Sequence, residues 1–330
     1  MKEILERLFA HGRLSREEAK SILQAIAVQK FPVVQTAAFL AAYRMRPPVA
    51  QELSGFRDAL LELCLAVDLS GYDCIDVCGT GGDNKQTFNI STITALVLAG
   101  AGVSVAKHGN YAVSSNCGSS NVLEALGVPL PAEAGAVRKQ LETCGICFIH
   151  APFFHPALKS VAPIRKELGV RTFFNILGPL VNPARPKYQL VGVFSPELLR
   201  LYSHVLQQGE QCYMIVHGLD GYDEVSLTST VKIIRGRREE LYEPHELGFE
   251  RLKDEEHYGG SSIEEARRIF ISILEGDGTE AQNNVVIANA GLALACRESS
   301  RDLEGCFLRA RESLESKKAL HVLKRLTDSC

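Results

Sequence analysis

The sequence predicts an α/β protein in which a small all-helical domain precedes a larger α/β domain with a central, mostly parallel sheet. Residues 1–70 show only the apolar spacing of amphipathic helices, whereas residues 71–330 alternate short apolar strands with helices. Strands that alternate with helices are typical of a largely parallel sheet. A length of 330 residues suits two domains of ordinary size.

The composition is that of an ordinary globular chain. Hydrophobic residues make up 46% and charged residues 23%, which excludes a disordered chain and a small disulfide scaffold. The net charge is −3, so neither nucleic acid nor an anionic membrane is expected as the main partner. The sequence contains no run of 18 apolar residues and no recognisable signal peptide, and most of its ten cysteines lie in apolar runs. We therefore expect free thiols and a cytoplasmic location.

Three helical patterns define the predicted small domain. Ser15 and Glu18 have the spacing of a capping box, and apolar residues follow them at helical intervals. Two further helices are expected on either side of a Pro-Pro break, over 33–43 and 51–65. None of these helices carries a catalytic pattern, so we expect them to pack against the rest of the chain or against a second copy. A Pro-interrupted stretch near 155–185 predicts a helical excursion that completes this domain.

Alternating strands and helices define the predicted large domain. Short apolar runs predict strands over 74–78, 103–106, 146–149, 189–194, 212–216, 225–227 and 231–234. Helices are expected over 90–101, 121–126, 131–143 and 196–207, and in most of the tail over 262–326. The charged run over 250–257 is interpreted as a solvated loop.

A glycine-rich turn follows the first predicted strand, with the sequence Gly-Thr-Gly-Gly-Asp over 79–83. Glycines permit positive φ and let backbone N–H groups approach an anion, and ligands collect at the carboxyl ends of strands in α/β sheets. The turn lacks the final glycine of a dinucleotide-binding motif and the lysine of a P-loop. It therefore indicates either an anion site or a plain strand-to-helix connection.

Polar side chains at the next helix favour the anion site. Asn89, Ser91 and Thr92 lie where helical N–H groups are unpaired and the helix dipole is positive, and an ordinary cap needs only one of them. Lys107 ends the second strand, which places its ammonium group at the same edge of the sheet. Together these residues predict a phosphate-binding edge.

An acidic turn follows the strand over 212–216. Asp220, Asp223 and Glu224 lie within five residues, which suits either an exposed turn or a magnesium site. Magnesium prefers one or two carboxylates, with waters and substrate phosphates as its other ligands. Both interpretations remain open from these residues alone.

An ordered series of motifs resembles anthranilate phosphoribosyltransferase. The series comprises 79–83, 87–92, 107–110, Ser114-Ser115, Gly118-Ser119, 155–157, Arg165, 168–172, 175–180, Asn182-Pro183 and Asp223-Glu224. Each motif alone is unspecific, but their order and spacing along the whole chain are highly specific. The resemblance implies a fold of the nucleoside phosphorylase and phosphoribosyltransferase type.

The resemblance also implies a reaction. The chain would transfer the phosphoribosyl group of phosphoribosyl pyrophosphate to the amine of anthranilate, giving N-(5-phosphoribosyl)anthranilate and pyrophosphate in tryptophan biosynthesis. It would use Mg²⁺ and form a homodimer through the helical domain. A pyrimidine nucleoside phosphorylase-like enzyme and a non-catalytic nucleic-acid-binding relative remain alternatives. Arg165 and Asn110 favour the transferase, because they suit a small aromatic acid, and the mildly acidic chain disfavours the nucleic-acid binder.

Three sets of site residues are implied by the resemblance. The donor-binding set is Gly79, Gly82, Asp83, Thr87, Asn89, Ile90, Ser91, Thr92, Lys107, His108, Gly109, Asn110, Ser114, Ser115 and Ser119. The anthranilate-binding set is Gly79, Asn110 and Arg165, and the metal-binding set is Ser91, Asp223 and Glu224. No catalytic residue is assigned, although His108 is a candidate acceptor for the released proton.

Three positions depart from the pattern that the resemblance implies. Asn84 stands where glycine is common, Tyr111 where arginine is common and Asn121 where aspartate is common. None of them removes an implied ligand. Tyr111 removes a positive charge beside the donor site, so we expect a change in donor affinity and not in the reaction.

Overall fold

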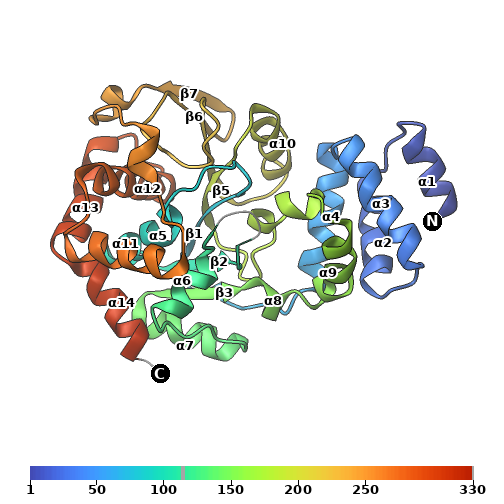
Figure 1. Cartoon of the computed structure of the whole chain (residues 1–330), viewed down its shortest axis with the longest axis horizontal. Helices are drawn as coiled ribbons and strands as arrows, with labels where there is room; N and C mark the ends of the chain where they lie inside the picture. The colour runs from blue at the N-terminus through green and yellow to red at the C-terminus, as the bar shows by residue number, and fades with distance from the viewer. Residues whose placement is uncertain (113–115, 329–330) are drawn as a thin grey trace. The chain divides into compact units, whose positions relative to one another are not determined.

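The computed structural model describes residues 1–112 and 116–328, and it divides the chain into two units (Figure 1). The helical unit comprises Met1–Ala66 and Ala151–Pro183, and the α/β unit comprises Val67–His150 and the chain from Ala184 onward. The sequence predicts this boundary at residue 70 and the excursion near 155–185.

The helical unit consists of α-helices with two short 3₁₀ helices. They are α1 Lys2–Phe9, α2 Arg16–Ala27, α3 Val33–Met45, α4 Ala50–Leu63, α8 Ala151–Phe154, α9 Pro156–Leu168, η1 Phe173–Ile176 and η2 Gly178–Leu180. The predicted capping box starts α2, because the Ser15 hydroxyl accepts the Glu18 N–H at 3.2 Å and the Ser15 N–H donates to the Glu18 carboxylate at 2.8 Å.

An aromatic cluster holds the two segments of the helical unit together. Phe39, Tyr43 and Phe56 pack edge to face, with ring centroids 5.2 to 6.1 Å apart. Phe173, from the later segment, stacks on Phe56 with centroids 4.3 Å apart. The excursion therefore supplies part of the core of the helical unit.

A buried carboxylate connects the loops of the helical unit. Glu52 lies fully buried in α4 and accepts the N–H groups of Leu14 and Val49, each at 2.9 Å, and the Tyr43 hydroxyl at 3.1 Å. The Arg46 guanidinium pairs with it at 2.7 Å. Burial alone would raise the pKa of Glu52, but Arg46 and the two backbone donors outweigh burial and lower it. The carboxylate therefore stays charged and fully hydrogen-bonded.

A seven-stranded sheet forms the centre of the α/β unit, in the order β3-β2-β1-β4-β5-β6-β7. Its strands are β1 Ile75–Gly79, β2 Val105–Gly109, β3 Ile146–His150, β4 Tyr188–Gly192, β5 Cys212–Gly218, β6 Val231–Arg235 and β7 Arg238–Tyr242. Strands β1 to β5 are parallel, and β6 and β7 form an antiparallel hairpin at one edge. The predicted α/β class with a mostly parallel sheet is confirmed.

Helices pack on this sheet in layers. They are α5 Ile90–Gly100, α6 Ser119–Ala125, α7 Ala134–Cys144, α10 Pro196–Leu206, α11 Ile263–Glu275, α12 Glu280–Glu298, α13 Leu303–Glu315 and α14 Lys318–Asp328, with 3₁₀ helices η3 Pro244–Leu247 and η4 Asp254–His257. Helices α5 and α12 are buried along most of their length beside the sheet, and α13 and α14 pack outside them (Figure 1). No helix in the described part of the chain has the length and hydropathy of a membrane span.

Two sequence-based assignments in the α/β unit are wrong. Residues 225–227 form no strand, because Leu227 adopts a positive φ of 62° and the Val225 N–H donates to the Asn289 side chain. Strand β7 was missed, because this exposed edge strand is polar on both faces. The run over 250–257 is charged and mostly exposed, as expected, but it ends in the buried His257.

Candidate functional site

The candidate site lies in the α/β unit, at the carboxyl ends of its central strands. Strand β1 ends at Gly79 beside Gly192, the last residue of β4, and the glycine turn continues from β1 toward the start of α5. Gly81 and Gly82 adopt the positive φ values of 66° and 83° that the turn requires. The backbone of the turn is thereby arranged at the sheet edge where ligands bind in α/β folds.

The acidic turn after β5 folds back over this edge. The Gly81 N–H donates to Asp223 Oδ2 at 2.6 Å, and the Ser91 N–H donates to Glu224 Oε1 at 3.1 Å. The two carboxylates thus connect the glycine turn with the first turn of α5. The acidic turn is therefore part of the site and not an exposed loop.

Two glycines make room for this approach. A Cβ atom at Gly79 would lie 2.4 Å from Asp223 Oδ2, and a Cβ atom at Gly192 would lie 1.5 Å from the Asp223 carbonyl oxygen. Both separations are far shorter than any van der Waals contact. The placement of Asp223 therefore depends on the absence of side chains at the ends of β1 and β4.

Lys107 lies buried beneath the start of α5. Its ammonium Nζ donates to the Val77 carbonyl oxygen at 2.7 Å and to the Ser91 hydroxyl at 3.3 Å. The sequence predicts Lys107 at the edge of the sheet that carries the glycine turn, and in the structure its ammonium group contacts Ser91 there. A fixed positive charge in a buried site interacts strongly with an anion.

Burial raises the pKa of Asp83, Asp223 and Glu224, that of Glu224 to about 8. The charges of Asp83 and Glu224 raise the pKa of Asp223 further, whereas the Lys107 ammonium lowers that of Glu224. A cation bound beside these buried carboxylates would stabilise their charged forms, and carboxylate oxygen atoms suit Mg²⁺. The described residues include no group of three or more His, Cys, Asp or Glu side chains that could hold a metal ion. A magnesium ion here would therefore need further oxygen ligands from substrate and water.

A hydrogen bond connects the loop after β2 to the start of α6. The Asn110 N–H donates to the Ser119 hydroxyl at 3.2 Å, and a Cβ atom at Gly109 would lie 2.4 Å from that oxygen. His108 is buried, and its backbone N–H donates to Asp76 Oδ1 at 3.3 Å. The structure therefore brings Gly109, Asn110 and Ser119 together, while Ser114 and Ser115 lie outside the described residues.

The residues around the start of α5 differ in what they offer a ligand. Ile90 and Thr92 are buried. The Asn89 side chain does not cap α5 but donates to the Cys117 carbonyl oxygen at 3.1 Å. Thr87 forms an isolated β-bridge with Tyr258. Contacts from this segment to a ligand would therefore come largely from its backbone and from Ser91.

Arg165, the third residue predicted for anthranilate, belongs to the helical unit. Its guanidinium lies over the Phe174 ring, 5.3 Å from the centroid, and burial lowers its pKa. The guanidinium makes no hydrogen bond or ion pair with any residue that the structure describes. A half-buried guanidinium without a carboxylate partner suits an anionic ligand.

The three departures from the expected pattern have local explanations. Asn84 adopts a positive φ of 60°, a conformation that asparagine tolerates better than most residues. Asn121 Oδ1 accepts the Ala112 N–H at 2.9 Å and the Gly118 N–H at 3.1 Å, so it serves as the acceptor that an aspartate would be. The loop geometry therefore does not require glycine or aspartate at these positions.

Tyr111 takes part in contacts of its own. Its hydroxyl donates to Glu124 at 2.8 Å, and its ring packs edge to face on His150 with centroids 4.6 Å apart. The side chain that replaces the common arginine is thus directed toward α6 and β3.

Comparison with known proteins places these features in a family. The model of the glycosyl transferase family helical bundle domain matches residues 2–64, and that of the family's a/b domain matches residues 71–320. The chain is 53% identical to the anthranilate phosphoribosyltransferase of Christiangramia forsetii, over 99% of this chain and 98% of that relative. The chain belongs to the anthranilate phosphoribosyltransferase family.

Other members of the anthranilate phosphoribosyltransferase family agree with this assignment. The enzyme of Cytophaga hutchinsonii is 52% identical over 98% of this chain and 99% of its own. The crystal structure of the Thermus thermophilus enzyme matches with a TM-score of 0.91 and 35% identity over 98% of both chains. The Saccharomyces cerevisiae enzyme in complex with PRPP and Mg matches with a TM-score of 0.91 and 28% identity over 98% of this chain and 96% of its own.

Membership in the anthranilate phosphoribosyltransferase family confirms the predicted class of enzyme. The chain is a phosphoribosyl-transferring glycosyltransferase of tryptophan biosynthesis, as the sequence motifs indicated. The comparisons favour this reaction over the phosphorylase-like and the nucleic-acid-binding alternatives.

Sequence reasoning missed two residues that hold the acidic turn of this family member in place. One is Gly192, whose lack of a side chain admits Asp223. The other is Asn289 in α12, whose amide accepts the Val225 N–H at 3.1 Å and donates to the Val225 carbonyl oxygen at 2.9 Å. A lone asparagine in the apolar run over 285–296 was the available signal, since a buried amide must be hydrogen-bonded.

Replacing Gly192 with alanine should displace Asp223 and Glu224. We expect Gly192→Ala to lower the rate of phosphoribosyl transfer about 100-fold, because small displacements of site residues carry penalties of that size. The measurement is anthranilate consumption followed by fluorescence. Gly135→Ala is the control, because its added Cβ meets nothing within 4 Å. Wild-type activity in Gly192→Ala would contradict the role given to this close approach.

Proposed function

We propose that this enzyme binds phosphoribosyl pyrophosphate at the carboxyl ends of β1 and β2 and transfers its phosphoribosyl group to the amine of anthranilate. The observation that carries the proposal is the convergence of the glycine turn, the start of α5, Lys107 and the Asp223–Glu224 pair within hydrogen-bonding distance of one another. The structure of the Saccharomyces cerevisiae enzyme in complex with PRPP and Mg supports this choice of donor and metal.

The donor would be held by charge and by backbone groups. We assign this role to the glycine turn with Asp83 and Thr87, to the segment over 89–92, to Lys107 and to the loops that carry His108, Gly109, Asn110, Ser114, Ser115 and Ser119. The positive end of the α5 dipole and the buried Lys107 ammonium both favour an anion at this place.

Mg²⁺ would be held by Asp223 and Glu224, with the Ser91 hydroxyl beside them. The buried carboxylates fit a divalent cation, because burial and mutual repulsion make them unfavourable as unpaired anions. When bound, the ion supplies neutralisation of the negative charge on the pyrophosphate.

The residues of this chain would then act mainly on the leaving group. The reaction is a displacement at C1′ through an oxocarbenium-like transition state, in which the anthranilate amine attacks and pyrophosphate departs. Lys107 and the backbone N–H groups stabilise the departing charge, which is electrostatic preorganisation. Because an arylamine is neutral at pH 7, no strong base is needed before attack. The proton released afterwards could pass to His108.

Anthranilate would be recognised by Gly79, Asn110 and Arg165. The carboxylate of the substrate would supply the counter-charge that Arg165 lacks among the described residues. A guanidinium can bind a carboxylate through two parallel hydrogen bonds, which orients as well as holds the substrate.

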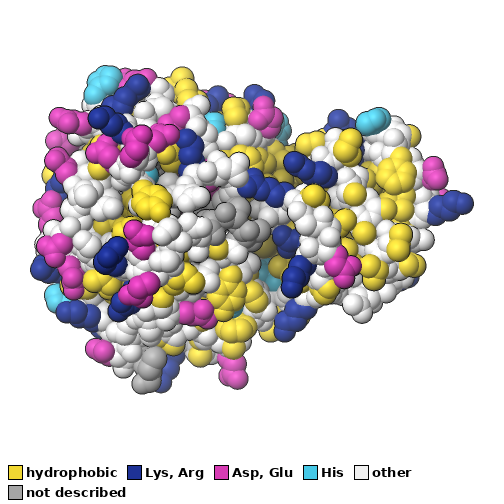
Figure 2. All heavy atoms as spheres, in the orientation of Figure 1, with side chains coloured by type: hydrophobic (Ala, Val, Ile, Leu, Met, Phe, Trp, Pro, Cys, Tyr) yellow, Lys and Arg dark blue, Asp and Glu magenta, His cyan; other side chains and the backbone are white. Residues whose placement is uncertain are grey.

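The assembly and location of the enzyme are also proposals. Figure 2 shows hydrophobic side chains on the surface of the helical unit, and the most exposed include Phe9, Val28, Val33, Val34 and Met45. Such exposure marks an interaction surface, so we assign residues 1–70, with the excursion near 155–185, as a dimerising domain and residues 71–330 as the donor-binding domain. The described cysteines are free thiols, which supports a cytoplasmic location, testable by cell fractionation.

Neutralising Asp223 and Glu224 should reduce the turnover that depends on magnesium. We expect Asp223→Asn with Glu224→Gln to lower the Mg²⁺-dependent turnover by about 100-fold or more, since two charged ligands are lost. Turnover is measured by anthranilate fluorescence over a range of Mg²⁺ concentrations. Asp220→Asn is the matched control in the same turn. Full activity of the double variant would place the metal elsewhere.

Removing the guanidinium should affect anthranilate and not the donor. We expect Arg165→Ala to raise the KM for anthranilate about 10-fold or more, because a charged hydrogen-bonded contact is lost. Steady-state kinetics with each substrate varied in turn provides the measurement, and Lys166→Ala, at the exposed next position of α9, is the control. An unchanged KM for anthranilate would refute the carboxylate role.

A charge on the exposed apolar surface should dissociate the dimer. We expect Val34→Glu with Met45→Glu to sediment as a monomer in analytical ultracentrifugation, while the wild type sediments as a dimer, because buried charges oppose association. Leu308→Glu, which changes an exposed apolar residue of the α/β unit, is the control. A monomeric wild type, or a dimeric double variant, would contradict this interface.

A further inference from the structure

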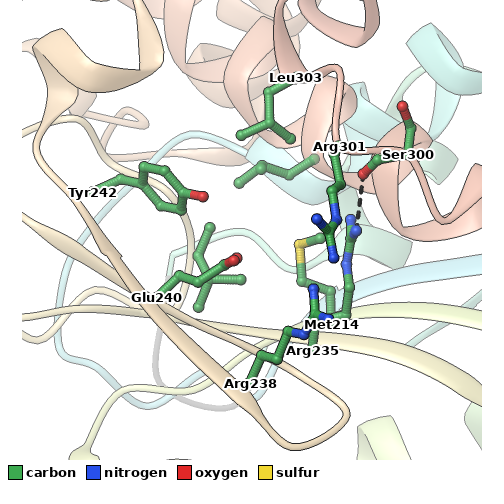
Figure 3. Close-up of a pocket in the computed structure, with 10 residues that line it drawn as sticks. Met214, Arg235, Arg238, Glu240, Tyr242, Ser300, Arg301 and Leu303 are labelled. Carbon is green, nitrogen blue, oxygen red and sulfur yellow. Dashed lines mark hydrogen bonds between the residues drawn. The ribbon is translucent and has the colours of Figure 1, made fainter.

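A cavity of about 200 Å³ lies in the α/β unit among residues that have no part in the site described above. It is formed by the β6–β7 hairpin on one side and by α12, the start of α13 and the loop between them on the other (Figure 3). Its lining consists of Met214, Ile233, Arg235, Arg238, Glu240, Tyr242, Leu292, Ser300, Arg301 and Leu303.

Positive charge is concentrated in this cavity. Figure 3 shows the side chains of Arg235, Arg238 and Arg301 gathered on one side of it. Arg235 donates through Nη1 to the Ser300 carbonyl oxygen at 2.8 Å, but its buried Nε has no hydrogen-bond partner in the described structure. Arg238 and Arg301 make no side-chain hydrogen bond or ion pair with any described residue. Guanidinium groups that line one side of a cavity repel one another, and an anion bound among them would offset this repulsion.

The rest of the lining selects among anions. Met214, Ile233, Leu292 and Leu303 provide an apolar wall, and the Tyr242 ring lies on the side of the cavity that faces the arginines (Figure 3). Glu240 is the one acid of the lining, on the same strand as Tyr242. An apolar wall favours a ligand with a carbon body, and Glu240 disfavours a ligand with several negative charges.

We propose that this cavity is a second ligand site, which binds a small carboxylate carried on an aromatic or aliphatic body. The carboxylate would pair with the guanidinium groups of Arg238 and Arg301, and the body would pack against the apolar wall and Tyr242. Arginine suits this role because its planar fork matches a carboxylate. The site is separate from the catalytic edge, since it is built from β6, β7, α12 and α13.

Calorimetric titration of the whole enzyme with benzoate tests the proposal. The titrations are made in the Arg165→Ala background, so that benzoate cannot pair with the guanidinium proposed for anthranilate. We expect Arg165→Ala to bind benzoate, and Arg165→Ala with Arg238→Ala and Arg301→Ala to bind it at least about 10-fold more weakly. Arg237→Ala in the same background, at an exposed neighbouring position outside the lining, is the matched control and should bind benzoate as Arg165→Ala does.

Two results would overturn the proposal. The first is benzoate binding that is absent from Arg165→Ala, or equal in Arg165→Ala and in the same variant with Arg238→Ala and Arg301→Ala added. The second is inorganic phosphate binding in this cavity more tightly than benzoate, which would mean that the apolar wall does not contribute to the choice of ligand. Arg238→Ala with Arg301→Ala in the enzyme that keeps Arg165 should retain wild-type phosphoribosyl transfer, so failure of this proposal is distinguishable from failure of the proposed catalytic site.

Discussion

The candidate site depends on the close approach of Asp223 to the ends of two strands. Gly192 leaves room for the Asp223 backbone and Gly79 for its carboxylate, and the Gly81 N–H then donates a hydrogen bond to that carboxylate. Once Asp223 is placed, Glu224 reaches the first turn of α5. The acidic turn can therefore contact the glycine turn because β1 and β4 end in residues without side chains.

The site resolves an apparent conflict between the charge of the chain and that of its substrates. A chain with a net charge of −3 acts on an anionic donor, yet its local arrangement is a buried ammonium, a helix N-terminus and a carboxylate pair suited to a cation. Short-range fields in a buried site are stronger than the distant charges of an exposed surface, which salt screens. Net charge thus describes the surface of this protein and not its site.

A residue that differs from the family pattern fits where it can adopt the same backbone conformation or make the same hydrogen bonds. Asn84 adopts the positive φ that a glycine would, and Asn121 accepts the two N–H groups that an aspartate would. Gly192 has no such substitute, because any side chain there meets the Asp223 backbone. The residues at positions 84 and 121 are thus constrained by backbone conformation and hydrogen bonding. The residue at position 192 is constrained by the lack of space for a side chain.

The sequence by itself determined the domain types, the glycine turn, the polar start of α5 and Lys107 at a strand end, because these depend on spacing between near neighbours. Only the tertiary structure decided that Asp223 meets Gly81, 142 residues away, that Asn289 anchors Val225, and that three arginines line one cavity. It also replaced the strand expected over 225–227 with an irregular segment in which Leu227 has a positive φ. Contacts of this kind follow from the order of strands in the sheet, which local patterns of hydrophobicity do not encode.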